Sequence, residues 1–136
     1  MRRGHQVFAS KKAACSTCHA MGYMGGRIGP DLTKIGQIRN DHDLIEAIVY
    51  PSSSFVRSYE PLTVSTLDGR IITGTIKNES TEELVLTLGA DQEARIQRSE
   101  IEEIKPGTIS IMPAGLDQQL TPEELADLLA FLKAAR

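Results

Sequence analysis

Hydrophobic and polar residues change their spacing twice along the chain, and these changes divide it into three segments. In residues 1–58 the apolar positions are typical of helices. One short helix is predicted to include Val7 and Phe8 and to continue through Ala14 into Cys15. The side chains of Val7 and Phe8 are expected to pack on the last helix of the fold. A second helix is predicted to begin after Asn40, an N-cap residue, and to end before Pro51. Its apolar residues at helical spacing are Leu44, Ile45, Ile48 and Val49.

The segment 59–106 alternates between apolar and polar residues, which is the period of a β-strand. Asp68-Gly69 is a strong signal for a two-residue hairpin turn, and Gly89-Ala90-Asp91 indicates another turn. Strands are therefore expected at residues 62–67, 70–77, 83–88, 94–97 and 101–104. Short antiparallel strands joined by tight turns predict a small antiparallel β-barrel or a bent sheet.

The segment 107–136 returns to a helical pattern. Thr121 is an N-cap residue, Pro122 suits the first helical position, and Glu124 completes a capping box. An apolar stripe follows, made of Leu125, Leu128, Leu129 and Leu132. A helix is therefore predicted from residue 122 almost to the end of the chain.

The predicted fold class is α+β, with a helical domain from residues 1–58 and 107–136 and an inserted β subdomain at 59–106. A chain of 136 residues can bury one core with such an insertion. Aromatic residues make up only 4% of it, and none is Trp. That supply is small for a core of this size, so an additional apolar group is expected to contribute to it.

The pentapeptide Cys15-Ser16-Thr17-Cys18-His19 is the strongest chemical motif in the chain. Two thiols at this spacing can each add to one vinyl group of a single porphyrin, and the imidazole that follows can bind the iron as an axial ligand. The motif therefore predicts covalently attached haem c. The glycine-rich residues 21–32 that follow are expected to form an irregular loop, whose backbone can pass close to a flat ligand.

Two other interpretations of the cysteine pair are open. A structural zinc site needs four ligands, but the chain has only two cysteines, so His5 and His42 would have to be recruited from a distance. A redox dithiol of the thioredoxin type would follow a buried strand, whereas the residues before Cys15 predict a short helix. Haem attachment is favoured over both.

The second axial ligand is sought among the methionines. Met1 is terminal, and Met21 and Met24 follow the motif too closely to reach across a porphyrin. Met112 precedes the last helix in an extended loop, where Pro113 favours an extended backbone that presents the methionine side chain. Met112 is therefore the candidate distal ligand, with an ordinary core position as the alternative.

The overall charge limits the partners and the compartment. A formal net charge of −3 and a pI near 5.6 argue against nucleic acid as a partner. No apolar run approaches the length of a membrane span, and no apolar signal region follows Met1-Arg2-Arg3. Since bacterial haem attachment takes place outside the cytoplasm, the chain is expected to be periplasmic or otherwise extracytoplasmic, as an excised domain of a longer protein.

The order of these elements resembles the class I cytochrome c family. The matching parts are the helix that ends in the cysteine motif, the loop Gly29-Pro30-Asp31-Leu32, the Met112-Pro113 loop and the final leucine-rich helix. The resemblance implies thioether bonds to Cys15 and Cys18, with His19 as the proximal ligand and Met112 as the distal one. It also implies that Pro30 packs beside His19, and that the Pro30 carbonyl accepts a hydrogen bond from the imidazole Nδ1. Gly29 and Pro30 are therefore counted among the haem-binding residues.

With the β insertion, the chain looks like the C-terminal haem-binding domains of planctomycete-type multidomain proteins. This resemblance implies an electron carrier, not an enzyme, which accepts electrons from a fused upstream domain or a partner protein. The alternatives are a haem-based redox or ligand sensor in which Met112 leaves the iron, and a haem-free interaction module. The β segment is interpreted either as a spacer or as a docking face.

Overall fold

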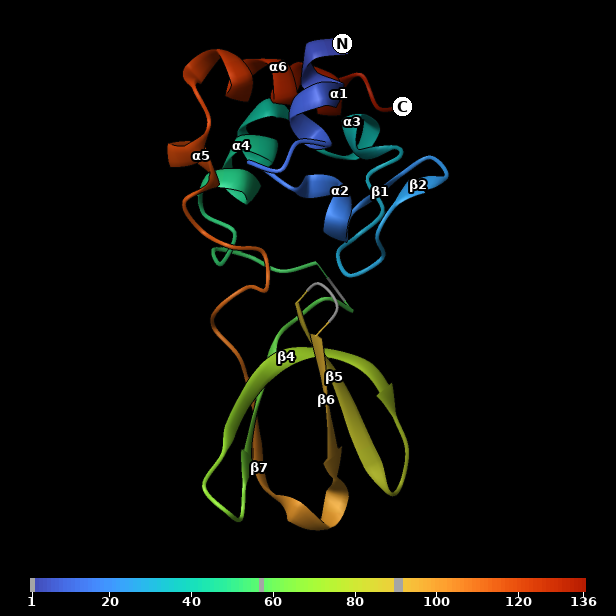
Figure 1. Cartoon of the computed structure of the whole chain (residues 1–136), viewed down its shortest axis with the longest axis vertical. Coiled ribbons are helices and arrows are strands. Elements are labelled where there is room, and N and C mark those ends of the chain that lie inside the picture. The colour runs from blue at the N-terminus through green and yellow to red at the C-terminus, as the bar shows by residue number, and fades with distance from the viewer. Residues whose placement is uncertain (1, 57, 90–91) are drawn as a thin grey trace. The chain divides into compact units, whose positions relative to one another are not determined.

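A computed structural model describes residues 2–56, 58–89 and 92–136 (Figure 1). The chain divides into two compact units, Met1–Ser54 with Met112–Arg136 and Phe55–Ile111. The first is mainly helical and the second is a sheet, so the predicted α+β class is confirmed. Among the helices of the described residues, none is long and apolar enough to span a bilayer.

The helical unit contains six α-helices within the described residues and a two-stranded hairpin. The helices are α1 (Arg2–Phe8), α2 (Cys15–Cys18), α3 (Ile35–Ile38), α4 (Asp41–Val49), α5 (Leu116–Gln119) and α6 (Pro122–Lys133). The hairpin pairs β1 (Ala20–Met21) with β2 (Met24–Gly25).

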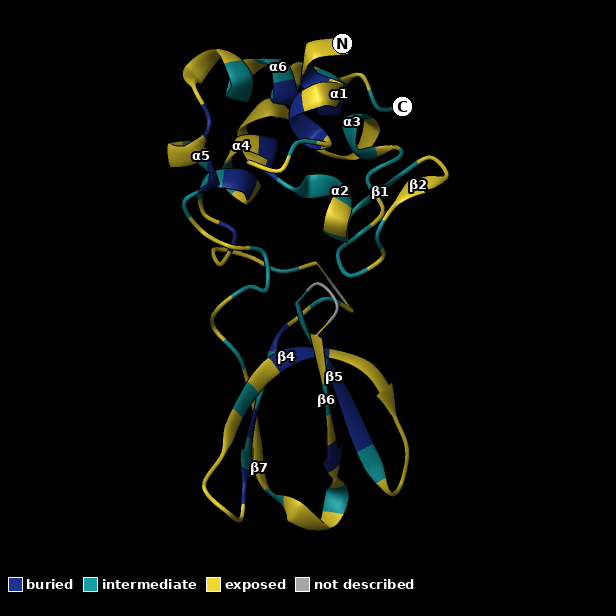
Figure 2. Ribbon diagram, viewed as in Figure 1, coloured by how far each residue is buried: buried dark blue, intermediate teal, exposed yellow. Residues whose placement is uncertain are grey.

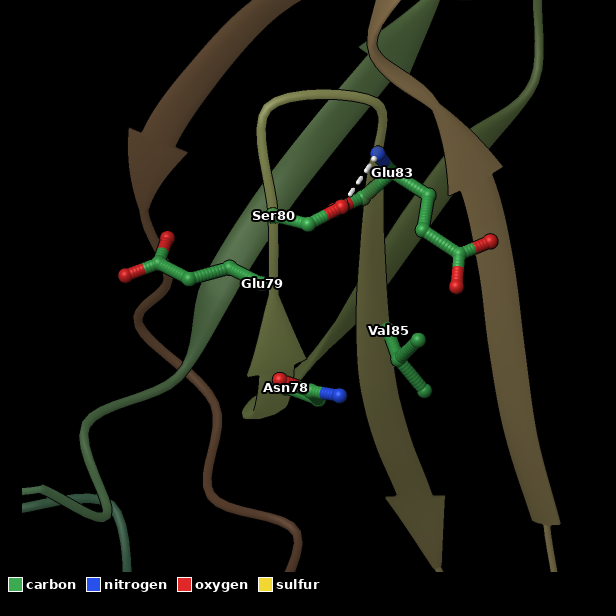
Figure 3. Close-up of a pocket in the computed structure, with 5 residues that line it drawn as sticks. All are labelled: Asn78, Glu79, Ser80, Glu83 and Val85. Atoms are coloured by element: carbon green, nitrogen blue, oxygen red, sulfur yellow. Dashed lines mark hydrogen bonds between the residues drawn. The ribbon is translucent and has the colours of Figure 1, made fainter.

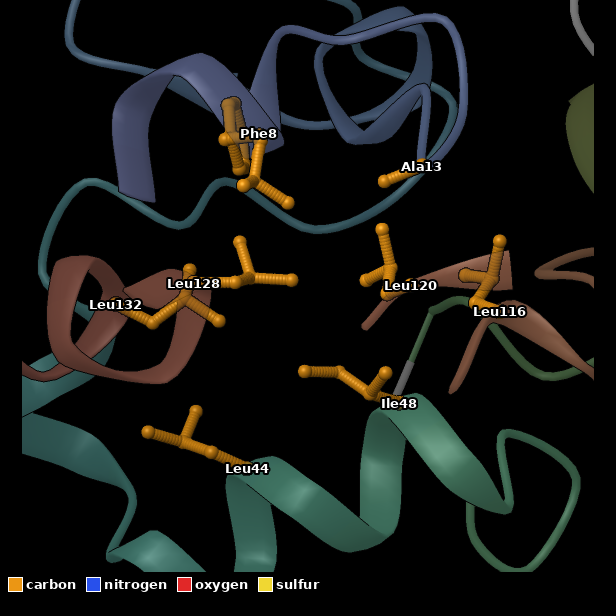
Figure 4. Packing of buried hydrophobic residues seen from close by; sticks show 9 residues of the cluster. Phe8, Ala13, Leu44, Ile48, Leu116, Leu120, Leu128 and Leu132 are labelled. Atoms are coloured by element: carbon orange, nitrogen blue, oxygen red, sulfur yellow. The ribbon is translucent and has the colours of Figure 1, made fainter. Parts of the chain in front are cut away.

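The core of this unit forms where α1 packs on α6, as the sequence predicted. A Cβ atom at Gly4 would lie 2.1 Å from the Asp127 carbonyl oxygen, so the two helices approach closely at that glycine. The Phe8 and Phe131 rings lie with centroids 5.5 Å apart. Leucine and isoleucine side chains from α4, α5 and α6 complete the buried cluster (Figures 2 and 4).

The caps of the two longest helices are those expected from the sequence. At α6 the Thr121 hydroxyl accepts a hydrogen bond from the Glu124 amide at 3.1 Å, and the Glu124 carboxylate accepts one from the Thr121 amide at 3.0 Å. At α4 the Asn40 side chain accepts from the Asp43 amide at 2.8 Å. These bonds satisfy amides that the first turn of a helix leaves without partners.

The β unit is a five-stranded antiparallel sheet, and all five predicted strands are present. They are β3 (Leu62–Thr66), β4 (Ile71–Glu79), β5 (Glu83–Gly89), β6 (Gln92–Gln97) and β7 (Ile101–Pro106), in the spatial order β6-β5-β4-β3-β7. The turn at Asp68-Gly69 joins β3 to β4, and Gly69 has the φ of +90° that such a turn favours. The expected turn residues Ala90 and Asp91 lie outside the described residues.

Of the two shapes expected for this sheet, the closed barrel is wrong. Strands β6 and β7 end the strand order, and no pairing between them occurs within the described residues. The register shifts at Ser65/Thr66, Ile76/Asn78 and Thr87/Gly89. Such irregularities increase local twist, which explains a bent open sheet (Figure 1). Its core is formed by Val64, Leu84, Leu86 and Ile96.

Two loops contain more regular structure than expected. Residues 21–32 were expected to be irregular, but they include the end of β1 and all of β2. Gly22 adopts a φ of +66°, which allows the tight turn of this hairpin, and Gly25 at the end of β2 adopts +105°. The loop before the last helix is interrupted by α5, which Gly115 precedes in the left-handed conformation.

Candidate haem site

Both cysteines of the motif belong to α2, a helix of a single turn. Ala14 precedes it with φ 54° and ψ 30°, a left-handed conformation that turns the chain into the motif. The helix expected to continue through Ala14 is therefore wrong, because α1 ends at Phe8 and residues 9–14 are not helical. Residues three apart lie on the same side of a helix, so Cys15 and Cys18 are neighbours along one face of α2. Both are free thiols and both are partly exposed. This arrangement suits two bonds to one flat ligand.

The surroundings of the thiols keep them protonated. Burial raises the pKa of the Cys15 thiol, and the neighbouring Cys18 raises it further against an opposing backbone hydrogen bond. Burial also raises the pKa of Cys18. Redox dithiols depend instead on a lowered pKa that supplies the nucleophilic thiolate. The raised pKa values therefore count against the thioredoxin-type interpretation.

His19 follows α2 directly and is held in one orientation. Its Nδ1 atom lies 2.7 Å from the Pro30 carbonyl oxygen. Because a carbonyl can only accept, Nδ1 carries the proton and Nε2 keeps its lone pair. Burial lowers the pKa of His19, with the Pro30 hydrogen bond opposing that change. The neutral ring with an available Nε2 is the form that binds metals.

Gly29 packs against the face of the same ring. A Cβ atom at this position would lie 2.6 Å from Cε1 and 2.9 Å from Nδ1 of His19. Real Cβ atoms do not approach other atoms so closely, so any side chain here would displace the imidazole. The hydrogen bond that the family resemblance implied between His19 and the Pro30 carbonyl is present, and the close approach of Gly29 to the ring adds to it.

The other glycines of this loop pack on the motif itself. A Cβ at Gly25 would lie 2.2 Å from the His19 carbonyl oxygen, and one at Gly26 would lie 2.0 Å from that of Thr17. The Gly26 amide also donates to the Ser16 carbonyl at 2.9 Å. The sequence suggested that these glycines admit a flat ligand. The structure gives them another role, because they let the loop fold back over α2.

Met112 is half-buried and packs against the core cluster of the helical unit. Cys15 is half-buried against the same cluster, so the structure brings these two candidate site residues to one core. Met24 is 76% exposed. Met21, set aside on sequence distance alone, also packs on the cluster, from β1. Met1 lies outside the described residues.

The histidines proposed as zinc ligands have other neighbours. His5 makes an edge-on contact with Phe131, with ring centroids 5.6 Å apart. His42 lies 3.6 Å from the Asp43 carboxylate. Within the described part of the chain, no group of three or more His, Cys, Asp or Glu side chains is placed to hold a metal ion. A haem iron differs, because the porphyrin supplies four of its ligands.

Sequence reasoning missed one polar cluster beside the histidine. The Asp31 carboxylate accepts hydrogen bonds from the Thr33 hydroxyl at 2.5 Å and from the Thr33 amide at 2.8 Å. The hydrogen bond from the Thr33 side chain is the main reason that the pKa of Asp31 is lowered. The spacing Asp-x-Thr is typical of a local turn of this kind and was the available signal.

The β unit has a small surface pocket at the turn between β4 and β5 (Figure 3). It is lined by Asn78, Glu79, Ser80, Glu83 and Val85. Its two carboxylates already have partners, since Glu79 pairs with Arg98 at 3.3 Å and Glu83 with Arg95 at 2.9 Å. The Glu83–Arg95 pair joins β5 to β6, and the Glu79–Arg98 pair joins β4 to the residue after β6, so both carboxylates belong to the charged surface of the sheet.

Comparison with known proteins does not assign the chain to a family. It matches no family model, and a search of the curated proteins finds no match. The functional argument therefore depends on the geometry around α2 and His19.

The residues of this site fit a covalently attached haem in three respects. Two protonated thiols lie on one side of a helical turn. The next residue is a neutral histidine, whose Nδ1 is bonded to a backbone carbonyl, which leaves Nε2 for a metal. A half-buried methionine packs on the same core as the first cysteine. Each feature meets a requirement of a c-type haem site with histidine and methionine ligands.

Proposed function

We propose that this chain is a c-type cytochrome domain, which transfers single electrons through a haem attached to Cys15 and Cys18. The observation that carries the proposal is the 2.7 Å hydrogen bond from His19 to the Pro30 carbonyl, directly after the two free thiols. A haem c in this site would supply one-electron chemistry at its iron. The fold of the helical unit is then that of a class I cytochrome c.

The two cysteines hold the group by addition. Cys15 and Cys18 would each hold a vinyl group through a thioether, with the thiol hydrogen passing to the other vinyl carbon and the vinyl double bond becoming single. No oxidant is needed. The raised pKa values of Cys15 and Cys18 keep both sulfurs protonated until attachment.

His19 and Met112 are the proposed axial ligands. The Pro30 carbonyl fixes the His19 tautomer and raises the basicity of Nε2, and Gly29 leaves the space that the ring occupies. A thioether from Met112 on the other side favours a higher reduction potential than a second histidine would. Two protein ligands leave no open position, so we assign an electron carrier rather than an enzyme.

The expected setting follows from attachment. Haem is joined to such motifs outside the cytoplasm, so the proposed location is the periplasm or another extracytoplasmic compartment. The electron donor is a fused upstream domain or a partner protein.

A second candidate function is a haem-based redox or ligand sensor. It is favoured by one observation, that Met112 is the first residue of its unit after the β unit ends at Ile111. In such a sensor Met112 would leave the iron and the β unit would report the change. Carbon monoxide added to the reduced wild-type protein separates the two, since a stable methionine ligand resists exchange and a displaceable one does not.

The proposal is tested by export of the chain in a host with cytochrome c assembly enzymes. The wild type should retain haem on a denaturing gel stained for haem peroxidase activity. The Cys15→Ala/Cys18→Ala double variant should lose the stained band, and Ser16→Ala, a change between the cysteines, should keep it. A wild-type band without stain would refute covalent attachment.

A further inference from the structure

Two stretches of chain run side by side in the same direction at His19. The Gly29 amide donates to the Cys18 carbonyl at 2.8 Å, and the Leu32 amide donates to the Ala20 carbonyl at 2.9 Å. The bond between the His19 ring and the Pro30 carbonyl lies between these two in sequence. The histidine is thus held to the second stretch by bonds on both sides.

A cluster of side-chain hydrogen bonds joins the two stretches again just after the bond between Leu32 and Ala20. The Thr33 hydroxyl accepts a hydrogen bond from the Gly22 amide at 2.8 Å and donates one to the Asp31 carboxylate at 2.5 Å. The same carboxylate oxygen accepts from the Thr33 amide at 2.8 Å. Asp31 and Thr33, called here the Asp31–Thr33 clamp, therefore join the turn after β1 to the residue that follows Pro30.

The clamp influences the position of the Pro30 carbonyl oxygen, which accepts the hydrogen bond from Nδ1 of His19. The Pro30 carbonyl belongs to the planar peptide group that Pro30 shares with Asp31, so a rotation about the N–Cα bond of Asp31 tilts that plane and moves the oxygen. Proline has no amide proton, which means that Pro30 cannot anchor itself by donating a hydrogen bond. Its orientation depends on Gly29 before it and on the clamp after it.

We propose that Asp31 and Thr33 are positioning residues, which hold the Pro30 carbonyl against Nδ1 of His19 and thereby select the tautomer with Nε2 available. The inference rests on the proposed function for the role of His19 as a ligand, but the tautomer itself is a property of the chain without haem. A carboxylate kept ionised by its Thr33 hydrogen bonds is a strong acceptor for this purpose.

The first test uses haem-free protein labelled with ¹⁵N at histidine. NMR of the ring nitrogens reports the ratio of the two His19 tautomers. The wild type should populate mainly the Nδ1-protonated form. Thr33→Val, which removes the hydroxyl at nearly constant volume, should lower that ratio about tenfold, the effect of one typical hydrogen bond. Thr33→Ser restores the hydroxyl and should return the ratio to within about twofold of wild type.

The matched control is Thr63→Val, because the Thr63 hydroxyl also makes an exposed hydrogen bond, to Thr73 at 3.2 Å, but lies in the β unit. This control should leave the tautomer ratio unchanged. An unchanged ratio in folded Thr33→Val would overturn the inference, as would an equal change in Thr63→Val. If Thr33→Val does not fold, Asp31→Ala supplies the second variant, and it should shift the ratio in the same direction.

The second test uses the haem-loaded protein. A histidine that loses its Nδ1 hydrogen bond becomes a weaker donor and stabilises oxidised iron less, so Thr33→Val should raise the reduction potential and Thr33→Ser should restore it. Haem staining should be equal in all of them. A wild type without haem would refute the proposed function and leave the tautomer test valid. A stained Thr33→Val with wild-type potential and tautomer ratio would refute the clamp alone.

Discussion

The imidazole of His19 donates a hydrogen bond to the Pro30 carbonyl oxygen across 2.7 Å. The two residues are brought together by a loop of 11 positions that folds back over α2 on closely packed glycines. A ring bonded in this way keeps one tautomer without any ligand present. The haem-free chain therefore holds His19 in the tautomer whose Nε2 keeps its lone pair.

Gly29→Ala should disturb the ring more than any other small change in this loop. The added Cβ would lie 2.6 Å from Cε1 of His19, so the imidazole or the loop must move. Overpacking of this kind destabilises by about 1–3 kcal/mol. Urea unfolding of the haem-free variant and wild type measures the difference.

Gly89→Ala is the matched control for that experiment. Among the described residues its added Cβ would meet only the Gln92 side chain, at 4.0 Å, and Gly89 does not have a positive φ. We expect a change within about 0.5 kcal/mol. Equal losses in the two variants would show that Gly29 is not specially constrained.

The thiols of the haem-free protein should react slowly with iodoacetamide. Burial raises the pKa of both cysteines above the ordinary value of 9.0, so the reactive thiolate is scarcer in the folded chain than in free cysteine at the same pH. The alkylation rate measured against pH should have its midpoint above 9.0. Protein unfolded in urea should react at the rate of free cysteine. A midpoint below that of free cysteine would instead favour a redox dithiol.

The capping box of α6 predicts a dependence of stability on pH. The pKa of Glu124 is lowered from the ordinary value of 4.5, first by the Lys12 side chain and then by the Thr121 backbone. Because the folded state holds this carboxyl ionised more readily, its contribution to stability is present above pH 4.5 and is lost as the pH falls through the folded-state pKa.

Glu124→Gln isolates that contribution, since the amide retains a capping oxygen but not the charge. Wild type should exceed the variant in free energy of unfolding near neutral pH, and the gap should close in acid. Glu123→Gln, in the same turn but outside the capping box, should show little gap at either pH. A gap for Glu124→Gln that persists at low pH would mean that its cause is not the carboxylate charge.

Local signals in the sequence were sufficient for much of the fold. The box at Thr121 and the turn at Asp68-Gly69 act over a few residues, so both could be predicted without knowledge of distant contacts. Whether the sheet closes could not be predicted from local signals, because closure depends on pairing between the two end strands, β6 and β7. The hairpin β1–β2 was missed since each strand has only two residues.

The candidate site was predictable in its residues but not in its supports. The motif identifies Cys15, Cys18 and His19 by spacing alone. The clamp at Asp31 and Thr33 depends on a bond to Gly22, which is close only after the loop folds back. No periodic pattern in the sequence predicts that Gly22 and Thr33 lie within hydrogen-bond distance. The position of Met21 on the same core as Met112 was equally hidden, because it follows from the turn after His19.

The proposed role of Met112 is tested by Met112→Ala. The change should remove the thioether from the iron while Cys15, Cys18 and His19 remain, so haem stays attached and its sixth position opens. Three results should appear together: loss of the weak long-wavelength sulfur-to-iron absorption of the oxidised protein, a lower reduction potential, and new binding of cyanide or carbon monoxide. Absorption spectra and a redox titration measure all three.

Two methionine controls separate ligation from packing. Met24→Ala alters a side chain that is 76% exposed and should change none of the three properties. Met21→Ala removes a side chain from the core that Met112 also contacts, so it should lower the melting temperature but keep the absorption band. If Met21→Ala lost the band and Met112→Ala kept it, the distal ligand would be Met21. If the wild type lacked the band and none of the three variants changed the spectrum, a histidine such as His5 or His42 would replace methionine as the candidate, and the argument for a high-potential electron carrier would fail.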